Sequence, residues 1–550
     1  MLMQVQRGAA AGARAPRAAA PAAAAPARAG AAAAGPLARR RRPLLAPPLR
    51  VLSDKAPPAA GEEDQAPNSL TPEQLARLEA AAAPAPGTDA GAEDPWAAGS
   101  KWQQYKWTVY RGQAYDLTAF LKRHPAGSWL LNLAIGRDCT ALFESYHLRP
   151  EVATARLGML PKLDGFPVAA VPRSPYPNDS ELYNAIRARV RKEVFKGGEA
   201  QGKHRSGSEV AVLTILGSSA LAYALYATAP GALTGAILGL AGAWIGLTVQ
   251  HCGNHGAMST SPAANLALGL TDDLIGGSSL CWRYHHQVSH HVHCNAAEYD
   301  EDVFSSLPLL RFDPRQPREP HHKWQHVYMW FLFPFLQLSF QYGDLFALYH
   351  GRTKGANMYG AEGWERASIA LGKAAHYGLL LAVPWATHGA AAALVGAACY
   401  TAAQSVVLAS TFAVSHNVPE SKPLEDNACR AELYKDLAER DWAVQQVLTS
   451  ANWGGAVGNF MTGGLNLQIE HHLFPAVFFG YYPAISAIVE DECTKRGIPY
   501  AKYQTLPSIL KQFVGFMRDV GRADQIEGEA AGDVARPAMD RAFNAAIARI

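Results

Sequence analysis

The sequence predicts a multi-domain protein in which a small α+β domain precedes an all-α domain embedded in a membrane. Polar residues dominate the chain as far as about residue 208, and long apolar blocks follow. Four blocks, at 210–228, 231–250, 367–387 and 390–414, approach the roughly 20 residues with which an α-helix crosses a bilayer. We therefore expect about four transmembrane helices, arranged as two hairpins.

Segment 327–349 is also apolar, but the polar stretch before it carries His321, His322 and His326. This combination is typical of an element that lies in the membrane interface or re-enters the membrane. We do not count it as a span, so the number of spans stays even. An even number returns the chain to one membrane face, where the polar segments that flank the spans can meet.

The charge and cysteine content argue against two classes of protein. The net charge is +3 and only 18% of the residues are charged, so no nucleic-acid partner is indicated. The seven cysteines form neither a CxxC pair nor a paired framework, which argues against a disulfide scaffold. The fold therefore does not require an oxidising compartment.

The amino terminus resembles an organelle address. Residues 1–53 hold nine arginines and no acidic residue, and they lack the compact apolar core of a secretory signal. This pattern predicts a transit peptide, with an alanine-rich extension that carries no address as the alternative. Residues 54–100 read as a disordered linker, in which Thr71-Pro72-Glu73-Gln74 could begin one short helix.

Three short histidine clusters carry the chemistry. They are HCGNH at 251–255, HHQVSHH at 285–291 and QIEHH at 468–472, each near an apolar segment. The first two hold histidines four positions apart, which an α-helix places on one face. A lone pair of this kind is more often packing, but three clusters together favour a metal site. The predicted ligands are His251, His255, His286, His290, His291, His471 and His472.

The donor set of these clusters is rich in nitrogen. Imidazole is the commonest metal ligand among side chains, and the clusters lack the pattern of a zinc finger or an all-oxygen cation site. Iron, copper and zinc all suit such a set. Redox-active iron fits best with the haem-binding pattern that lies upstream.

That upstream pattern lies in residues 101–163, where short strands and turns are expected. His124-Pro125-Ala126-Gly127 precedes an apolar stretch, and His147 follows it. Two histidines on separate helix–loop segments can clamp a haem iron from opposite sides. Pro125 restricts the turn after His124, and Gly127 lets the backbone approach the haem edge.

The three clusters resemble the histidine boxes of membrane fatty-acid desaturases. Gln468, where that family often has histidine, resembles the front-end branch, whose members carry a fused cytochrome b5 domain. The resemblance covers about residues 100–505. It implies a di-iron centre with His286, rather than His285, as the opening ligand of the second box. It also implies Gln468 as a ligand or as a residue that orients one, and no catalytic residue beyond the ligands.

Two more features of the chain enter through the resemblance. His416, at the end of an apolar run, is a further ligand candidate, with an ordinary helix-end histidine as the alternative. His124-Pro125-Ala126-Gly127 resembles the haem loop of cytochrome b5, with His124 and His147 as axial ligands of haem b. The family has HPGG where this chain has HPAG, which matters only if residue 126 needs a positive φ.

The expected domain boundaries complete the prediction. Residues 164–208 should be a linker with a basic, solvated helix that tethers haem near its electron acceptor. The desaturase domain should occupy 209–510, with an uninformative tail at 511–550.

The resemblance implies an O2-dependent acyl-lipid desaturase of polyunsaturated fatty-acid biosynthesis. Electrons would come from cytochrome b5 reductase or a ferredoxin-linked reductase through the haem, and the cofactors would supply the oxidation. The address suggests a chloroplast membrane, and delta-4 desaturation of galactolipids. The alternatives are delta-6 or delta-5 desaturation, a sphingolipid long-chain-base desaturase in the endoplasmic reticulum membrane, a di-iron lipid hydroxylase and an inert electron carrier.

Overall fold

A computed structural model describes most of the chain after residue 93, and its residues belong to one compact unit, Thr71–Ile550. The predicted transit peptide, the Thr71 helix start and the end of the predicted tail lie outside the described residues. The described ranges are 94–97, 99–172, 180–196, 208–297, 299–421 and 441–525.

The amino-terminal domain is built on one β-hairpin. Strands β1 (Trp107–Tyr110) and β2 (Gln113–Asp116) pair antiparallel. The two residues between them, Arg111 and Gly112, have φ values of 47° and 76°, as a tight type I′ hairpin turn requires. The predicted small α+β domain is confirmed. Short helices complete it: η1 (Lys101–Gln104), η2 (Leu121–Arg123), α2 (Ser128–Leu131), η3 (Asn132–Ala134), α3 (Thr140–Tyr146), α4 (Pro150–Leu157) and η4 (Val168–Ala170).

The predicted linker 164–208 is in part a packed helix. Helix α5 (Glu181–Arg189) continues into the π-helix η5 (Val190–Val194), and Ile186 is fully buried. Arg187 is also buried, and its guanidinium lies 3.3 Å from the Glu144 carboxylate of α3. The prediction of a solvated basic face was wrong here, because an ion pair with a distant acid lets the arginine enter the interior.

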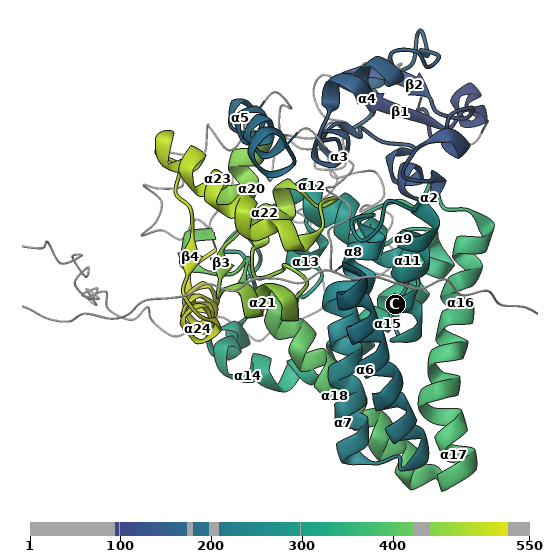
Figure 1. Ribbon diagram of the computed structural model, residues 1–550, viewed down its shortest axis with the longest axis vertical. Coiled ribbons are helices and arrows are strands. Elements are labelled where there is room, and N and C mark those ends of the chain that lie inside the picture. Colours follow the sequence, from purple (N-terminus) through teal and green to yellow (C-terminus); the bar gives the residue numbers. More distant parts are fainter. Residues whose placement is uncertain are drawn as a thin grey trace, which may run out of the picture. The chain divides into compact units, whose positions relative to one another are not determined.

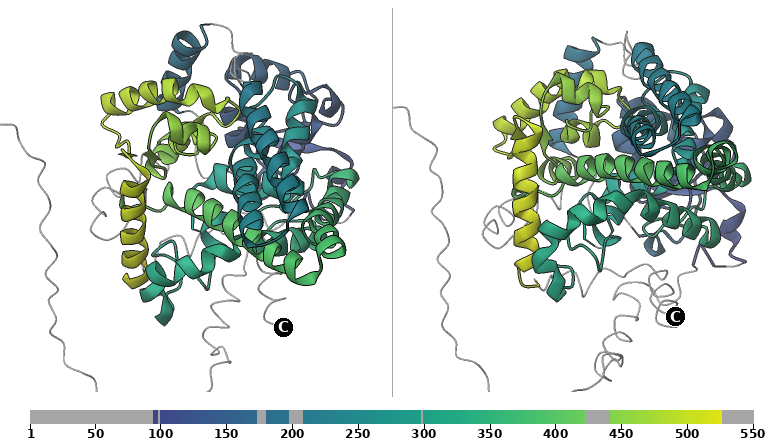
Figure 2. Two further views of the ribbon diagram at one scale, coloured as in Figure 1. Left: turned by 60° about the horizontal axis from the view of Figure 1, so that its bottom comes forward. Right: turned by 90° about the horizontal axis from the view of Figure 1, so that it is seen from below.

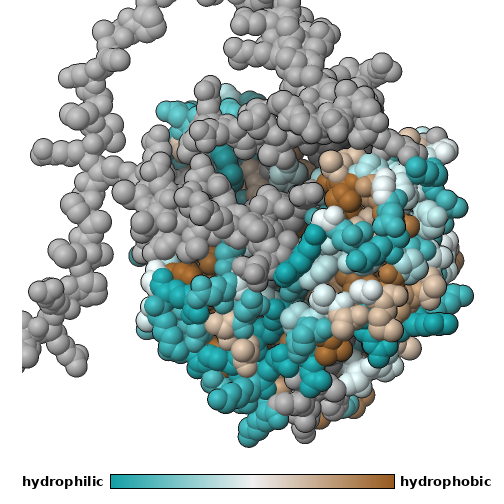
Figure 3. Space-filling view, turned by 90° about the horizontal axis from the view of Figure 1, so that it is seen from above, coloured by the Kyte–Doolittle hydropathy of each residue, from teal (hydrophilic) through white to brown (hydrophobic). Residues whose placement is uncertain are grey.

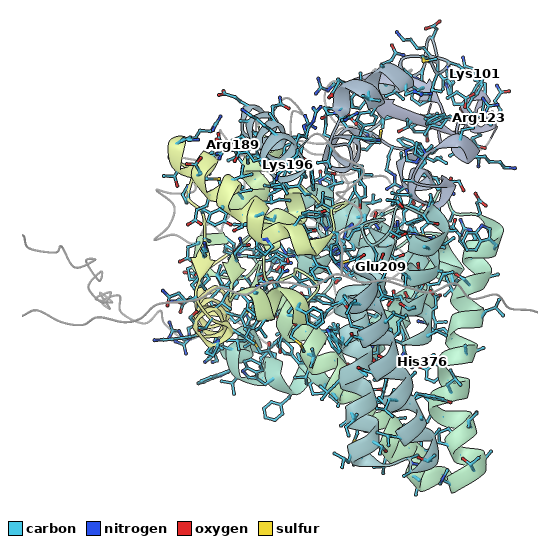
Figure 4. The ribbon with its side chains drawn as sticks, in the orientation of Figure 1. Lys101, Arg123, Arg189, Lys196, Glu209 and His376 are labelled. Atoms are coloured by element: carbon cyan, nitrogen blue, oxygen red, sulfur yellow. The ribbon has the colours of Figure 1, made fainter. Side chains whose placement is uncertain are left out.

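Helix α5 also contacts α23 (Tyr482–Lys495), as Figure 1 shows. Arg189, labelled in Figure 4, lies beside α23 and pairs with Asp491 and, at 2.8 Å, with Glu492. The helix therefore joins the amino-terminal domain to the carboxy-terminal part of the fold.

Three helical runs of the described residues are long and apolar enough to cross a membrane. They are α6 (Ser208–Thr228), the run from α7 (Ala232–Trp244) through the π-helix η7 (Ile245–Val249) into α8 (Gln250–Asn254), and α18 (Ala390–Val414). Side chains such as Leu213 and Leu233 stay exposed on these helices, as expected for surfaces that face lipid. The predicted helical domain is thereby confirmed, with three candidate membrane spans among its described residues.

The fourth expected span, 367–387, is an interrupted helical run. It comprises α16 (Gly363–Tyr377), the π-helix η11 (Gly378–Ala382) and α17 (Val383–His388). Helix α16 alone has 15 residues and carries Lys373, so it is not among the three runs above. That this run crosses the membrane stays a prediction.

Glycines allow α7 and α18 to approach closely. A Cβ atom on Gly235 would lie 2.2 Å from the carbonyl oxygen of Gly396, and one on Gly239 would lie 2.4 Å from that of Tyr400. Only a residue without a side chain fits at both positions, which is how small residues let helices pack in membranes. This contact fixes the end of α18, where His416 lies, relative to the first histidine box.

The predicted interfacial segment 327–349 is a helix pair broken at Pro334. Helix α14 (Gln325–Leu332) and α15 (Leu336–His350) are separated by the 3-10 turn η10 (Phe333–Phe335). Proline removes a backbone donor and so interrupts the helix. Large apolar side chains are exposed along both helices, which suits a membrane surface: Val327, Trp330, Phe331, Phe335, Leu338, Tyr342, Leu345 and Tyr349.

Short elements connect the spans and surround the histidine boxes. Figure 3 views the protein from above, on the side of the amino-terminal domain. The described residues on this face are mostly hydrophilic or intermediate, in contrast to the exposed apolar side chains of the candidate membrane helices. The connecting elements are α9 (Pro262–Gly269), α10 (Thr271–Leu274), α11 (Ser279–Trp282), the π-helix η8 (Arg283–His290), α12 (His291–His293), α13 (Glu301–Phe304), η9 (Pro320–Trp324) and η12 (Pro419–Ser421).

The carboxy-terminal part closes over the boxes. It contains α20 (Trp442–Leu448), β3 (Asn452–Trp453), α21 (Ala456–Met461), α22 (Gln468–Leu473), η14 (Phe479–Tyr481), α23, β4 (Lys502–Tyr503) and α24 (Leu506–Arg522). Strands β3 and β4 pair in parallel. Helix α24, yellow in Figure 2, packs on α14.

The boundary expected at 510 was therefore placed too early. Helix α24 runs to Arg522 and buries Phe513 and Phe516 completely. Its apolar side chains alternate with charged ones at helical spacing, which is typical of a helix with one buried face. The domain thus includes the first residues of the predicted tail.

This packing predicts that Phe513→Ala destabilises the protein. Removing a fully buried phenylalanine side chain costs about 3–5 kcal/mol of unfolding free energy. Gly515→Ala on the same helix is the control, because a Cβ there meets nothing within 4 Å, and alanine favours helix by about 1 kcal/mol. Thermal unfolding in detergent should show a lower Tm for the first variant alone. Equal Tm values would contradict the assignment of α24 to the folded domain.

Candidate metal centre and haem pocket

Histidines from four separate segments gather in one buried cluster. The first box ends the α7–α8 run, the second lies in η8 and α12, the third lies in α22, and His416 follows α18. The second box forms a π-helix rather than the expected α-helix. Such wider turns are frequent at functional sites, and here His286, His290 and His291 all contribute to the cluster.

One group of imidazoles surrounds a first position. Ligand atoms of His251, His255, His286 and His471 lie within 4.8 Å of one another. The Nε2 atom of His291 is 3.1 Å from that of His286 and 3.0 Å from that of His471. Nitrogens about 3 Å apart are what bonds of about 2.0–2.1 Å to a shared metal ion produce.

A second group lies beside the first. Ligand atoms of His290, His416, His472 and Cys294 also lie within 4.8 Å of one another. The rings of His291 and His472 stack with their centroids 4.3 Å apart, which joins the two groups. The Gln468 side-chain nitrogen is 2.8 Å from His416 Nε2. The arrangement therefore offers two adjacent metal positions, and Gln468 lies at the second.

Protein groups hold the outward nitrogen of several rings. His472 Nδ1 donates to Gln446 Oε1 at 2.6 Å, and His416 Nδ1 donates to the Thr449 carbonyl at 3.0 Å. Fixing Nδ1–H in this way leaves Nε2 as the free lone pair. The Nε2 atom of His472 is buried without a hydrogen-bond partner. A bound metal ion would satisfy it.

His255 and His290 are held by residues that sequence reasoning missed. His255 Nδ1 lies 2.7 Å from the Tyr146 hydroxyl, and its Nε2 is also buried without a hydrogen-bond partner. His290 Nδ1 lies 3.0 Å from an Asp300 oxygen. A carboxylate on the outward nitrogen raises the basicity of a metal-binding imidazole. The acidic run that begins ten residues after His290 was the available signal for Asp300.

Burial keeps most of these rings neutral, which is the form that binds metal. Burial and neighbouring histidines hold the pKa values of His286, His291, His471 and His472 well below their usual range. Burial likewise lowers the pKa of His416 to about 3.

His285 belongs to a different environment from its neighbour His286. Its Nε2 is 2.6 Å from an Asp302 oxygen. Burial lowers its pKa, but the charges of Glu301 and Asp302 outweigh burial and raise that pKa to about 10. The structure thus brings His286, and not His285, into the cluster.

The two predicted haem ligands face one another in the amino-terminal domain. The ring centroids of His124 and His147 are 6.3 Å apart and their planes are perpendicular, at 89°. That gap suits an iron ion with one bond of about 2 Å to each ring. His147 Nδ1 donates to the Phe143 carbonyl at 2.7 Å, which leaves its Nε2 for the metal.

Ala126, which replaces a glycine of the HPGG pattern, lies at a position whose backbone does not require glycine. Gly127 has a φ of 93°, and a Cβ atom there would lie 2.7 Å from the Trp129 side chain. Ala126 is not among the residues with positive φ. Glycine is thus retained at the position whose backbone requires it, and the pocket fits haem.

A cavity of about 460 Å³ leads away from the histidine cluster. His286, His290, His416 and Gln468 border one part of it. Its remaining walls carry charged side chains such as Glu301, Asp302 and Lys354 together with an apolar set, which includes Leu309, Phe333, Phe335, Leu336, Leu408 and Phe412. Binding sites commonly combine apolar walls with polar groups that fix the orientation of the ligand. This one can hold an alkyl chain against the metal positions.

Comparisons with known proteins agree with this geometry. A family model for fatty acid desaturases matches residues 227–504. A model for the cytochrome b5-like haem/steroid binding domain matches residues 100–191, which carries that domain through α5, beyond the end at 163 that the sequence suggested.

Several curated desaturases are similar over most of their length. The chloroplastic acyl-lipid (7-3)-desaturase of Chlamydomonas reinhardtii is 66% identical over 75% of this chain and 80% of that protein. The acyl-lipid (7-3)-desaturase of Rebecca salina is 32% identical over 77% of this chain and 92% of its own. The acyl-lipid (8-3)-desaturase of Physcomitrium patens is 31% identical, over 76% and 88%. The chain therefore belongs to the fatty acid desaturase family, with a cytochrome b5-like domain ahead of the desaturase domain and with haem and a di-iron centre as its cofactors.

Proposed function

We propose that this chain is a front-end acyl-lipid desaturase that acts at the delta-4 position of polyunsaturated acyl chains in a plastid membrane. The cavity bordered by His286, His290 and His416 carries this proposal, because its apolar wall can hold an alkyl chain beside the metal positions. The names of the two (7-3)-desaturases support the position, and the chloroplastic relative supports the compartment. Delta-5 and delta-6 desaturation are the nearest alternatives, and the (8-3)-desaturase relative makes them relevant.

The ligand assignment follows the two groups of nitrogen atoms. We assign His251, His255, His286, His291 and His471 to one iron ion. His290, His416 and His472 bind the other, with Gln468 either as a fourth ligand or as the group that orients His416. His124 and His147 bind haem b.

When bound, the di-iron centre supplies O2-dependent oxidation of an unactivated methylene pair. The protein itself positions the substrate and excludes water. Phe333, Leu408 and Phe412 line the cavity and hold the alkyl chain, so which carbons lie at the iron site depends on where the lipid headgroup stops. Asp300 accepts a hydrogen bond from His290 Nδ1, and Gln446 accepts one from His472 Nδ1. Each contact holds the proton on Nδ1, so that Nε2 of the same ring points inward.

Haem held by His124 and His147 in the cytochrome b5-like domain would supply the electrons. The donor to the haem is a cytochrome b5 reductase or a ferredoxin-linked reductase. A plastid location favours the ferredoxin-linked enzyme, whereas an endoplasmic reticulum location favours the other. The arginine-rich residues 1–53 support the plastid.

The regiochemistry is tested by expressing the chain without residues 1–53 in a host fed C16 and C18 polyunsaturated acids. We expect a new cis double bond on the carboxyl side of the existing ones, at the delta-4 position, and no product from His471→Ala. Mass spectrometry resolved by lipid class measures both. A bond at delta-5 or delta-6 would contradict the position alone, and a hydroxylated product would contradict desaturation.

The ligand assignment predicts that His416→Ala removes one of the two iron ions. The variant should bind about one iron per chain where the unaltered protein binds about two, since loss of a ligand weakens a metal site strongly. His293→Gln is the control, because its ring packs on Tyr299 at 5.1 Å and lies outside the two groups. Elemental analysis of purified protein gives the count. Two iron ions in His416→Ala would exclude His416 as a ligand.

A further inference from the structure

The end of helix α3 lies between the two cofactor sites. His147 follows the helix directly and faces His124 in the haem pocket. Tyr146, the last residue of the helix, points to the desaturase domain instead. Its hydroxyl lies 2.7 Å from His255 Nδ1, although the two residues are 109 positions apart in the chain. Adjacent residues of one helix end therefore reach both proposed metal sites.

The hydrogen bonds of Tyr146 fix the orientation of His255. The tyrosine O–H donates to Gln287 Oε1 at 2.7 Å, since the amide oxygen can only accept. The Gln287 nitrogen in turn donates to the Asn254 carbonyl at 2.8 Å, which sets the direction of its amide. The tyrosine oxygen must then accept from His255 Nδ1–H. This leaves His255 Nε2 as a lone pair that points into the first metal position, where it is buried without a hydrogen-bond partner.

Other contacts dock the two domains tightly. Asn132 of η3 donates to Glu362 at 3.2 Å, and Tyr284 donates to the Asn132 carbonyl at 3.4 Å. A Cβ atom on Gly360 would lie 2.1 Å from that carbonyl, so the backbones are in direct contact. These contacts hold the domains together without involving a proposed iron ligand. Tyr146 differs from these residues, because its hydroxyl forms a hydrogen bond with His255, a proposed iron ligand.

We propose that Tyr146 is a positioning residue that joins the two redox centres, because it aims His255 at the iron site and couples the haem ligand's helix to that site through one hydrogen bond. The inference rests on the ligand assignments proposed above. The path runs from His147 through one peptide unit and the Tyr146 side chain to His255. Haem held by His124 and His147 would supply one electron and be oxidised, and an iron ion held by the buried histidines would accept it and be reduced. Tyr146 keeps its O–H bond and is not consumed.

Tyr146→Phe tests this, because it removes the hydroxyl and keeps the ring. The full chain in lipid nanodiscs is reduced without oxygen and then mixed with O2 and an acyl-lipid substrate, while haem absorbance reports the rate of haem oxidation. We expect that rate to fall about tenfold or more, the usual effect of losing a residue that orients a metal ligand. Tyr284→Phe is the matched control, since it loses a hydrogen bond between the domains that touches no proposed ligand. Its rate should not change.

Two further measurements make the outcome decisive. The haem spectrum should be the same in all variants, and iron content is measured and restored with ferrous iron where it has fallen. A rate in iron-loaded Tyr146→Phe equal to that of the unaltered protein would overturn the inference. His471→Ala gives the rate at which O2 alone oxidises the haem. If that rate equals the unaltered one, the electron does not pass to the di-iron site and the proposed ligand assignment itself fails.

Discussion

The structure depends on the burial of many imidazole rings in one place. Inward nitrogens of His286, His291 and His471 lie about 3 Å apart, and those of His255 and His472 have no protein partner. Buried polar atoms without partners are costly, so metal ions bound at these nitrogens would stabilise the cluster. The surrounding fold serves this requirement. The close contact of α7 with α18 fixes the first box relative to His416, and the carboxy-terminal part brings the third box onto them.

Local sequence patterns, together with the family resemblance for His416 and Gln468, named the residues that converge at the site. Each box is a short motif in a polar segment, and His124 and His147 stand in a recognisable haem pattern, so the residues that converge could be named in advance. The groups that orient them could not. Tyr146 and Gln446 carry no motif and reach their histidines across 109 and 26 residues, and only the acidic run at Asp300 offered a signal. Periodicity gives no information on such contacts.

The long apolar helices of the fold were also predictable from the sequence. Apolar runs predicted α6, the α7–α8 run and α18, because lipid imposes length and composition on a spanning helix. Two features escaped prediction. A π-helix and an α-helix have the same composition, so the widened turn of the second box left no signal. Arg187 looked like part of a solvated face because its buried partner, Glu144, lies far away in the sequence.

The haem domain packs against the desaturase domain, and this affects how electrons can pass between the two domains. A flexible tether would raise only the local concentration of the electron donor. Here α5 packs on both parts, and the end of α3 lies against the first box. Electron delivery can then occur within one fixed arrangement, without an encounter step between domains. The exposed apolar residues of α14 and α15 keep the opposite part of the fold suited to a membrane surface.

The central claim is that the buried histidines hold two iron ions through imidazole nitrogen. Iron-edge X-ray absorption of the purified protein tests it most directly. We predict a first shell dominated by nitrogen at about 2.0–2.2 Å, with the outer-shell scattering that imidazole rings produce and a second iron nearby. A sulfur contribution, which Cys294 could supply from the second group, or a shell composed mainly of oxygen would contradict the account.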